Sequence, residues 1–388
     1  MSERRTLGDV VELQRGTTYL SRLLGEPGPA LLGLGVIKRH GGFKGAGLKT
    51  YGGDSAAKLL LRPGDLFLSL KDVTQEAALL GAVARVPDSV PVGRLTQDTV
   101  KLTVTDGDVD PGYLYWILRA PQYREYCRQH AVGTTNLSLS REDFLSYPLP
   151  PATAARLRLI ELFETIEAKI AVNNRIAVTA DALRSAMLEH ARRERPQDFV
   201  ALPLSQVAEF VNGRAFTKDA TGDGRMVIRI AEINSGPGSS TVYNDIQVDE
   251  RHLARPGDIL FSWSGSLAVA RWFRPEAIIN QHIFKVIPRG ENPPWLAFDA
   301  VRSKLIHYRA VAADKATTMG HIQRHHLDEE VLVPGPTATA RLDRQAAGLW
   351  RRALVAEQES LTLIAFLDTL LPELLPGRLR VRDAGEAA

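Results

Sequence analysis

The sequence predicts an α+β protein of two tandem related domains, each a mixed sheet with helices and each followed by a long helix. Two observations support this. The first half of the 388-residue chain aligns with the second half, and internal repetition reveals architecture before any single motif does. Each copy ends in proline-rich residues that lead into a stretch of helix formers. We expect domains at 1–152 and 198–336, long helices at 153–197 and from 337, and a tail ending at 388.

The two copies align through short motifs. LGDVVELQRGTTY, from Leu7, matches LSQVAEFVNGRAF, from Leu204. RPGD at 62–65 matches RPGD at 255–258, and each quartet precedes a short apolar segment that ends in serine. This is the pattern of a Pro-Gly turn that leads into a buried strand. QDTVKLTV then aligns with QHIFKVIP, and TTNLSLSREDF with TTMGHIQRHHL.

Composition bounds the class of protein. The chain is 44% hydrophobic and 24% charged, which is typical of globular domains. It has no apolar run near the roughly 18 residues needed to cross a bilayer, and no signal peptide is evident. A single cysteine, Cys127, excludes an internal disulfide, so we expect a cytoplasmic protein. The net charge of +3 permits a nucleic-acid partner without requiring one.

The long helices carry apolar residues at alternating steps of three and four, which predicts a coiled-coil seam. Asn173 falls within this seam and would set its register. Two amphipathic helices that pack separately on their own domains are the alternative. At 1.5 Å per residue, roughly 40 residues would make a rod of about 60 Å that could hold two domains apart. The predicted seam residues are Ile166, Ile170, Asn173, Leu183, Met187, Leu349, Ala353, Ala356, Leu363 and Leu367.

The tetrapeptide NPPW at 292–295 is typical of DNA adenine or cytosine amino-methyltransferases, which use it to hold a flipped base. The first copy reads DPGY at 110–113, so the shared feature is a helix N-cap with proline in the first turn. No glycine-rich cofactor loop is common to both copies, and no GxxxxGK[ST] phosphate loop occurs. The sequence therefore favours no catalytic residues, and a methyltransferase stays an alternative.

His321, His325 and His326 form the densest cluster of potential metal ligands. The aligned residues of the first copy include no second set of ligands at a fixed spacing. We therefore predict a polar surface helix here and no metal site.

The whole chain resembles the specificity subunit of Type I restriction-modification enzymes. The most specific segment is GTTNLSLSREDFLSYPLPP, from Gly133, followed by LFETIEAKIAVNNRIAVTADALRSAML. Two further segments are similar to other hallmarks of the family: RPGDILFSWSGSLAVA and MVIRIAEINSG. The resemblance implies two target-recognition domains that each read half of a bipartite site in double-stranded DNA. It also implies an antiparallel helix pair that sets the gap between the halves.

The same resemblance implies no catalysis and no cofactor in this chain. Its expected partners are two methyltransferase subunits, which bind S-adenosylmethionine, and restriction (motor-nuclease) subunits, which use ATP and Mg²⁺. We expect no membrane partner. A recognition subunit of another phage-defence complex is a further alternative.

Candidate DNA contacts lie where the copies diverge, because base-reading loops differ between readers of different sequences. Basic glycine-rich loops suit phosphates, arginine can read guanine, and the paired threonines could donate to phosphates. Solvated loops and turn capping are the alternatives. The candidates are Lys38, Arg39, Lys44, Lys49, Lys71, Thr134, Thr135, Asn136, Arg214, Lys218, Arg225, Arg229, Ser264, Ser266, Thr317, Thr318 and Arg324.

Overall fold

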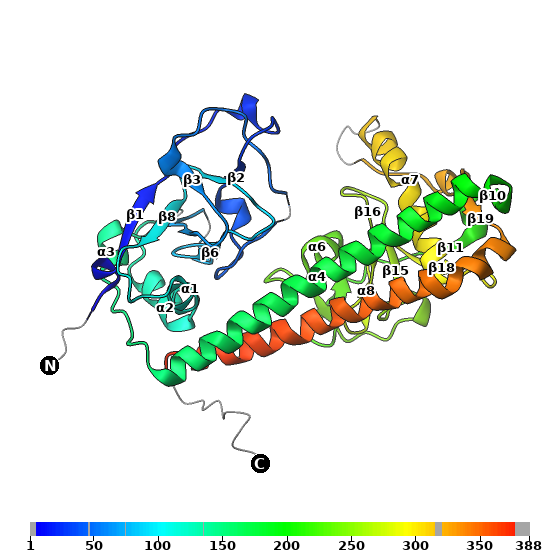
Figure 1. The fold of residues 1–388 in the computed structure, drawn as a ribbon. Helices are drawn as coiled ribbons and strands as arrows, with labels where there is room; N and C mark the ends of the chain where they lie inside the picture. The colour runs from blue at the N-terminus through cyan, green and yellow to red at the C-terminus, as the bar shows by residue number, and fades with distance from the viewer. Residues whose placement is uncertain (1–4, 46, 74, 135, 315–319, 377–388) are drawn as a thin grey trace, which may run out of the picture. The chain divides into compact units, whose positions relative to one another are not determined.

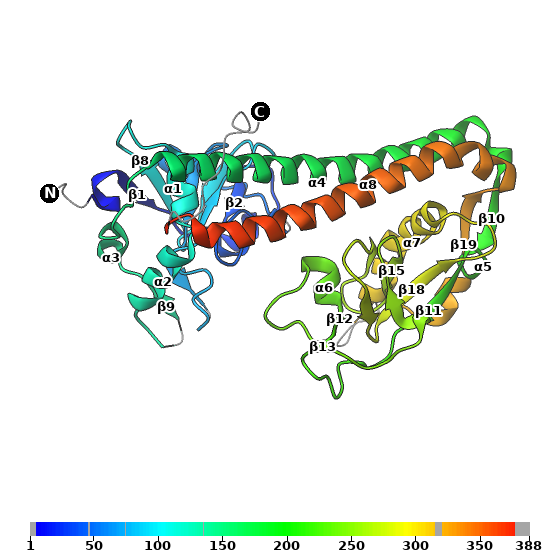
Figure 2. The same ribbon diagram turned by 90° about the horizontal axis from the view of Figure 1, so that it is seen from below.

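The computed structural model describes residues 5–45, 47–73, 75–134, 136–314 and 320–376. The chain divides into two compact units (Figures 1 and 2). Unit 1 comprises Met1–Glu167 and Ala365–Ala388, and unit 2 comprises Ala168–Ile364. Each unit therefore includes parts of both long helices as well as one of the two predicted domains. The predicted α+β class is confirmed.

The described residues of unit 1 form three small sheets. The first is antiparallel, in the order β1 (Val11–Arg15), β8 (Val100–Val104), β4 (Leu66–Leu68) and β6 (Val83–Arg85). The second has the order β2 (Ala30–Leu32), β7 (Gly93–Leu95) and β3 (Leu60–Leu61), with β2 parallel to β7. The third pairs β5 (Lys71–Asp72) with β9 (Leu137–Ser138). The helices are α1 (Pro111–Ile117), α2 (Pro121–Gln129), α3 (Arg141–Leu145) and the first part of α4 (Ala154–Glu194).

Unit 2 repeats the first two of these sheets. Its antiparallel sheet has the order β11 (Ala208–Asn212), β18 (Ile283–Pro288), β15 (Ile259–Ser262) and β16 (Ala268–Arg271). A mixed sheet has the order β13 (Tyr243–Asn244), β12 (Arg225–Ile228), β17 (Ala277–Ile279) and β14 (Leu253–Ala254). A third, antiparallel pair joins β10 (Phe199–Pro203) to β19 (Glu330–Pro334). The helices are α5 (Leu204–Val207), α6 (Ile230–Ser235), α7 (Pro294–Asp314) and most of α8 (Pro336–Leu370).

Equivalent side-chain contacts confirm the sequence repeat. In unit 1 the Asp65 carboxylate accepts from the Arg62 backbone N–H at 2.8 Å and pairs with Lys101 Nζ at 2.8 Å. In unit 2 Asp258 accepts from the backbone N–H of Arg255 at 2.7 Å and pairs with Lys285 at 2.9 Å. The RPGD motif is therefore a turn that is tied by its aspartate to the lysine of a neighbouring strand.

The glycine that directly follows β1 and β11 allows two backbones to approach closely. A Cβ at Gly16 would lie 2.0 Å from the carbonyl oxygen of Thr96, and a Cβ at Gly213 would lie 2.1 Å from that of Asn280. Real Cβ atoms do not approach other atoms so closely. These positions therefore exclude every side chain, which explains why both copies retain glycine.

The long helices agree closely with the predicted stretches, since α4 ends at Glu194 and α8 at Leu370. Within unit 2 the two helices are antiparallel. Asn173 of α4 contacts Glu359 of α8, and Ala177 and Ala180 of α4 pack with Ala353 further back along α8. No helix among the described residues is both long and apolar enough to span a membrane.

Replacement of Gly16 by alanine should destabilise unit 1 by about 1–3 kcal/mol, because the added methyl group overpacks the strand contact. Gly35→Ala is the matched control, since a Cβ at Gly35 would meet no neighbouring atom within 4 Å. The free energy of unfolding from urea titration would measure both. Equal stability of the two variants would contradict the close-packing argument.

Candidate nucleic-acid interface

Several loops of unit 1 meet at one end of its antiparallel sheet. Arg15 at the end of β1 lies opposite Val100 at the start of β8, and Val100 lies opposite Leu68 at the end of β4. The segments that follow β1 and β4 and that precede β8 therefore emerge together. The β5–β9 pair adds Leu137 and Ser138 to the same end.

The loop after β4 is held in shape from within. Buried Asp72 accepts a hydrogen bond from the Leu79 backbone N–H at 2.6 Å. Arg124 of α2 is only 3% exposed and donates to the carbonyl oxygens of Ala77 and Ala78 at 2.8 and 3.0 Å. A buried guanidinium needs such acceptors to offset its lost hydration. Sequence reasoning missed Arg124 because a helical pattern alone does not show that an arginine points inward.

Three loops of unit 1 lie side by side through direct contacts. The backbone N–H of His40 donates to Ala78 O at 2.8 Å, and Arg39 pairs with Glu76 at 2.6 Å. The side chain of Gln75 donates to Thr134 O at 3.1 Å. These contacts bring together part of the predicted set, all with exposed side chains: Lys38, Arg39, Lys71, Thr134 and Asn136.

The other predicted residues of unit 1 are placed differently. Lys44 and Lys49 are exposed but lie on the next segment, where their backbones bond to Val36 and Leu31. Thr135 lies outside the described residues.

Unit 2 presents the equivalent loops at the equivalent sheet end. Arg214 and Lys218 follow β11 and are exposed, as are Ser266 after β15 and Arg324 in the 3-10 helix Arg324–Asp328. The loop after β15 reaches the closing segment through a hydrogen bond of 2.9 Å from Gly265 N to Gly320 O. Thr317 and Thr318 lie outside the part of the chain that the structure describes.

Three predicted contacts of unit 2 are poorly available to DNA. Ser264 is only 5% exposed. Arg225, on β12 in the mixed sheet, pairs with Glu276 at 3.1 Å. Arg229 pairs at 2.7 Å with buried Glu232. Burial raises the pKa of Glu232, but hydrogen bonds from Arg229 and from a neighbouring threonine outweigh it and hold that pKa below its ordinary value.

The NPPW segment cannot hold a flipped base in this fold. Trp295 is 1% exposed, and its indole N–H donates to Asp343 of α8 at 2.8 Å. The Asn292 side chain donates to Val207 O at 3.0 Å. The N-cap prediction is confirmed for Asp110, which accepts from Tyr113 N at 3.0 Å. It is wrong for Asn292, whose amide is used as a donor toward α5 instead.

The histidine cluster is a local cap. His326 is buried, and its Nδ1 lies 3.0 Å from the backbone nitrogen of Gln323. The predicted surface location is therefore wrong for His326, because its ring serves the backbone of its own turn. His321 and His325 are exposed. Among the described residues, no group of three His, Cys, Asp or Glu is arranged to hold a metal ion.

The predicted seam is largely buried. Asn173 is fully buried and donates to Glu359 at 2.9 Å, while Ile166, Ala353, Ala356 and Leu367 are each at most 5% exposed. Four further seam residues are half-buried: Ile170, Met187, Leu349 and Leu363.

Leu183 is 55% exposed, so its assignment to the seam is wrong. The neighbouring Arg184, 0% exposed, takes its place. The seam was assigned by side-chain hydropathy, which favours burial of leucine over arginine. The sequence pattern does not show the carboxylates that neutralise this guanidinium in the folded chain.

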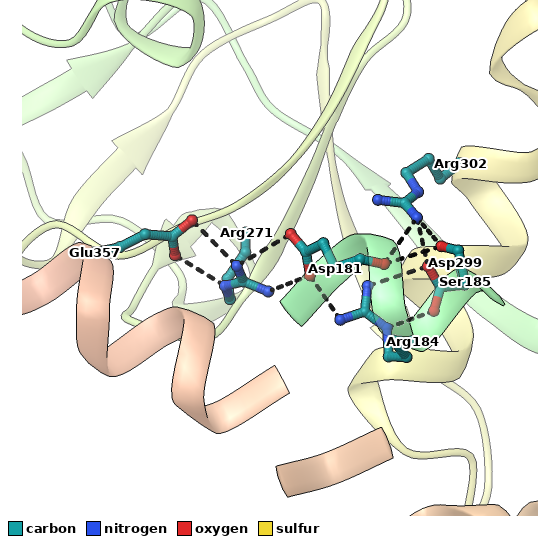
Figure 3. A network of polar contacts seen from close by, with 7 residues as sticks. All are labelled: Asp181, Arg184, Ser185, Arg271, Asp299, Arg302 and Glu357. Atoms are coloured by element: carbon teal, nitrogen blue, oxygen red, sulfur yellow. Dashed lines mark hydrogen bonds and ion pairs between the residues drawn. The ribbon is translucent and has the colours of Figure 1, made fainter. Parts of the chain in front are cut away.

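A buried ionic network joins both helices to the rest of unit 2 (Figure 3). Asp181 of α4 lies between Arg184 at 2.6 Å and Arg271 of β16 at 3.3 Å. Arg271 also pairs with Glu357 of α8 at 2.9 Å, and Arg184 with Asp299 of α7 at 2.5 Å. Four elements of unit 2 are therefore connected through one chain of charges.

Unit 1 anchors α4 at the equivalent position of its sheet. Arg85, at the end of β6, pairs with Glu164 and Glu167 at 2.8 and 2.6 Å. Trp116 of α1 donates to Glu164 at 2.7 Å, as Trp295 of α7 does to an aspartate of α8 in unit 2. Each unit thus uses a strand arginine and a helix tryptophan to hold the long helix that follows its sheets.

The fold is similar to that of a Type I restriction-modification S subunit from M. genitalium. The two share 15% sequence identity with a TM-score of 0.56, and the match covers 96% of this chain and 95% of that one. Two other structures also match along 96% of this chain. They are the HsdS subunit from Thermoanaerobacter tengcongensis (16% identity, TM-score 0.31, 96% of that chain) and a type I R-M system structure (17%, 0.34, 97%). Those two TM-scores are too low to support an argument.

No protein-family model matches the sequence. The search of curated proteins finds no match either. The resemblance to Type I specificity subunits is thus confirmed as a likeness of fold.

Two of the three acidic members of the network, Asp181 and Glu357, should respond oppositely to pH. Burial raises the pKa of Asp181, but Arg271 and Arg184 outweigh it and hold that pKa below its ordinary value. Its contribution to stability is therefore present above the ordinary carboxyl pKa and lost as pH falls through the lowered value. Burial raises the pKa of Glu357, so the charged form of this residue is the one that folding disfavours.

Asp181→Asn should lower the free energy of unfolding of unit 2 by about 3 kcal/mol at pH 7, because it leaves two buried guanidiniums undercompensated. The loss should shrink as the pH falls below the ordinary carboxyl pKa of about 4. Glu357→Gln is the matched control and should cost less at pH 7. Tryptophan fluorescence during urea unfolding reports mainly on unit 2, which contains four of the five tryptophans. Equal losses for both variants at pH 7 would contradict this interpretation.

Proposed function

We propose that the chain is the DNA-recognition subunit of a Type I restriction-modification complex, and that it binds a bipartite double-stranded site without catalysing any reaction itself. One observation carries the proposal. Two copies of one domain keep the same internal contacts at their turns and sheets, yet differ in the exposed loops at the same end of each sheet. The likeness of fold to an S subunit supports it.

The exposed loops suit a nucleic-acid partner chemically. Lys38, Lys71, Arg214 and Lys218 are exposed cations next to glycine-rich or serine-rich segments, where backbone amides can also approach phosphates. Because the loops differ in sequence between the units, each would read its own short set of base pairs. Specific base contacts come from side chains in the grooves, whereas phosphate contacts fix the register.

The long helices would set the distance between the two half-sites. Their small seam residues allow the two helices to pack closely within unit 2, and the charge network ties them to its sheets. The length of a stiff helix pair would then fix the distance between the two domains, and with it the number of base pairs between the half-sites. The geometry of a dimer sets half-site spacing in the same way in other DNA-binding proteins.

Two kinds of partner subunit would complete the complex. Two methyltransferase subunits would supply S-adenosylmethionine and the methyl transfer, and motor-nuclease subunits would supply ATP- and Mg²⁺-dependent cleavage, all in the cytoplasm. The isolated chain should show no S-adenosylmethionine binding in titration calorimetry. Measurable binding would instead favour a methyltransferase, although Trp295 is too deeply buried to stack on a base.

Removal of one heptad from each long helix tests the spacing. Deleting residues 168–174 together with the facing residues 358–364 keeps the seam phase and shortens the pair by about 10 Å. At 3.4 Å per base pair, the preferred gap should shorten by about three base pairs. Selection from a randomised duplex library would measure it, using the full chain with its co-purified partners.

Insertion of one heptad at the same two positions is the matched control and should lengthen the gap by a similar amount. Melting curves should show that both domains remain folded in either variant. An unchanged gap in both variants would mean that the helices do not set the spacing.

A further inference from the structure

A pocket of about 300 Å³ opens at the loop end of the antiparallel sheet in unit 1. Its floor is apolar and its rim is polar. The floor consists of Leu13, Leu70, Val100 and Leu139. The rim consists of Arg15, Lys71, Gln97, Asp98, Ser138 and Arg141.

The rim carries an excess of positive charge. It includes three cations, Arg15, Lys71 and Arg141, and one carboxylate, Asp98, which lies 3.8 Å from Lys71 Nζ. Arg15 uses its Nε to donate to Gln97 O at 3.3 Å. Within the described part of the chain, neither Arg15 nor Arg141 pairs with a carboxylate. Two guanidiniums are therefore available to an anion at the mouth of this pocket, and guanidinium is well matched to phosphate oxygens.

Unit 2 fills the equivalent position. The strand registers make Arg15 and Val100 equivalent to Asn212 and Phe284. Hydrogen bonds from Leu139 N to Leu70 O and from Ile322 N to Trp263 O likewise make Leu70 equivalent to Trp263. Two of the four floor residues in unit 1, Leu70 and Val100, thus correspond to the aromatic residues Trp263 and Phe284 in unit 2.

The Trp263 side chain covers this position. Its indole N–H donates to Asn212 Oδ1 at 2.8 Å. Its ring lies 5.1 Å from the ring of His282 and 5.8 Å from that of Phe284. The cations have also changed, since Arg15 is replaced by Asn212 and Lys71 by Ser264, while Arg141 is matched by Arg324.

We infer that the unit 1 pocket is a subsite for a DNA backbone phosphate and its deoxyribose, and that unit 2 has lost this subsite to Trp263. The guanidiniums of Arg15 and Arg141 bind the phosphate, and the apolar floor packs on the sugar. The two half-sites are consequently bound through different kinds of contact. Unit 1 contributes more of the charge-dependent affinity than unit 2. This inference rests on the proposed DNA-binding function.

Salt dependence of DNA binding tests the subsite. The probe is a duplex selected by the wild-type full chain from a randomised library. For Arg15→Ala and for Arg141→Ala, the slope of log K against log salt concentration should become shallower by about 0.9, the value expected for one lost phosphate contact. Lys58→Ala removes an exposed cation of the same unit outside the pocket and should leave the slope unchanged.

Leu70→Trp is the complementary variant, because it introduces the residue that covers the equivalent position in unit 2. It should weaken binding and make the slope shallower, as the arginine variants do. Circular dichroism melting would verify that the variant folds; if it does not, the two arginine variants decide the question.

The outcomes separate the two proposals. If the wild-type chain and its complex bind no duplex, the proposed function fails. If wild-type binding is normal but both arginine variants retain the wild-type slope, only the phosphate subsite is refuted.

Discussion

The arrangement of unit 2 depends on one carboxylate placed between two buried guanidiniums. Asp181 neutralises Arg184 and Arg271, whose side chains are 0% and 1% exposed. Unpaired charges at such depth would be strongly disfavoured, because they lose hydration without compensation. The carboxylate therefore requires α4, β16 and, through the further partners of the arginines, α7 and α8 to remain in contact. This geometry is directional, which apolar packing of small seam residues would not provide by itself.

The repeated scaffold and the diverged loops have different physical requirements. Gly16 and Gly213 sit against a carbonyl oxygen, and Asp65 and Asp258 satisfy a turn and a lysine at the same time. A change at such a position disturbs several contacts together. The exposed side chains of the loops at the sheet ends make few such contacts, so their chemistry can change while the loop backbone, held in unit 1 by Asp72 and Arg124, is kept. A single fold can thereby present a cationic pocket in one unit and a tryptophan in the other.

The anchoring of the helices and the loops that face a ligand lie on different parts of each sheet. In unit 1, Arg85 at the β6 edge holds α4, whereas Arg15 lies at the loop end of β1. Loops can therefore change without weakening the attachment to the helix. In the proposed function, this separation allows half-site preference and half-site spacing to evolve independently.

The sequence by itself determined the duplication, the long helices, the N-cap at Asp110 and the burial of Asn173. These follow from local patterns: repeated motifs, helical periodicity and side chains that bond within a few residues. The tertiary structure alone decided that Arg184 rather than Leu183 is buried, that Asn292 donates toward α5, and that Arg124 shapes a loop. Each of these depends on a partner distant in the chain, and periodicity carries no information about which distant carboxylate or carbonyl will compensate a buried polar group.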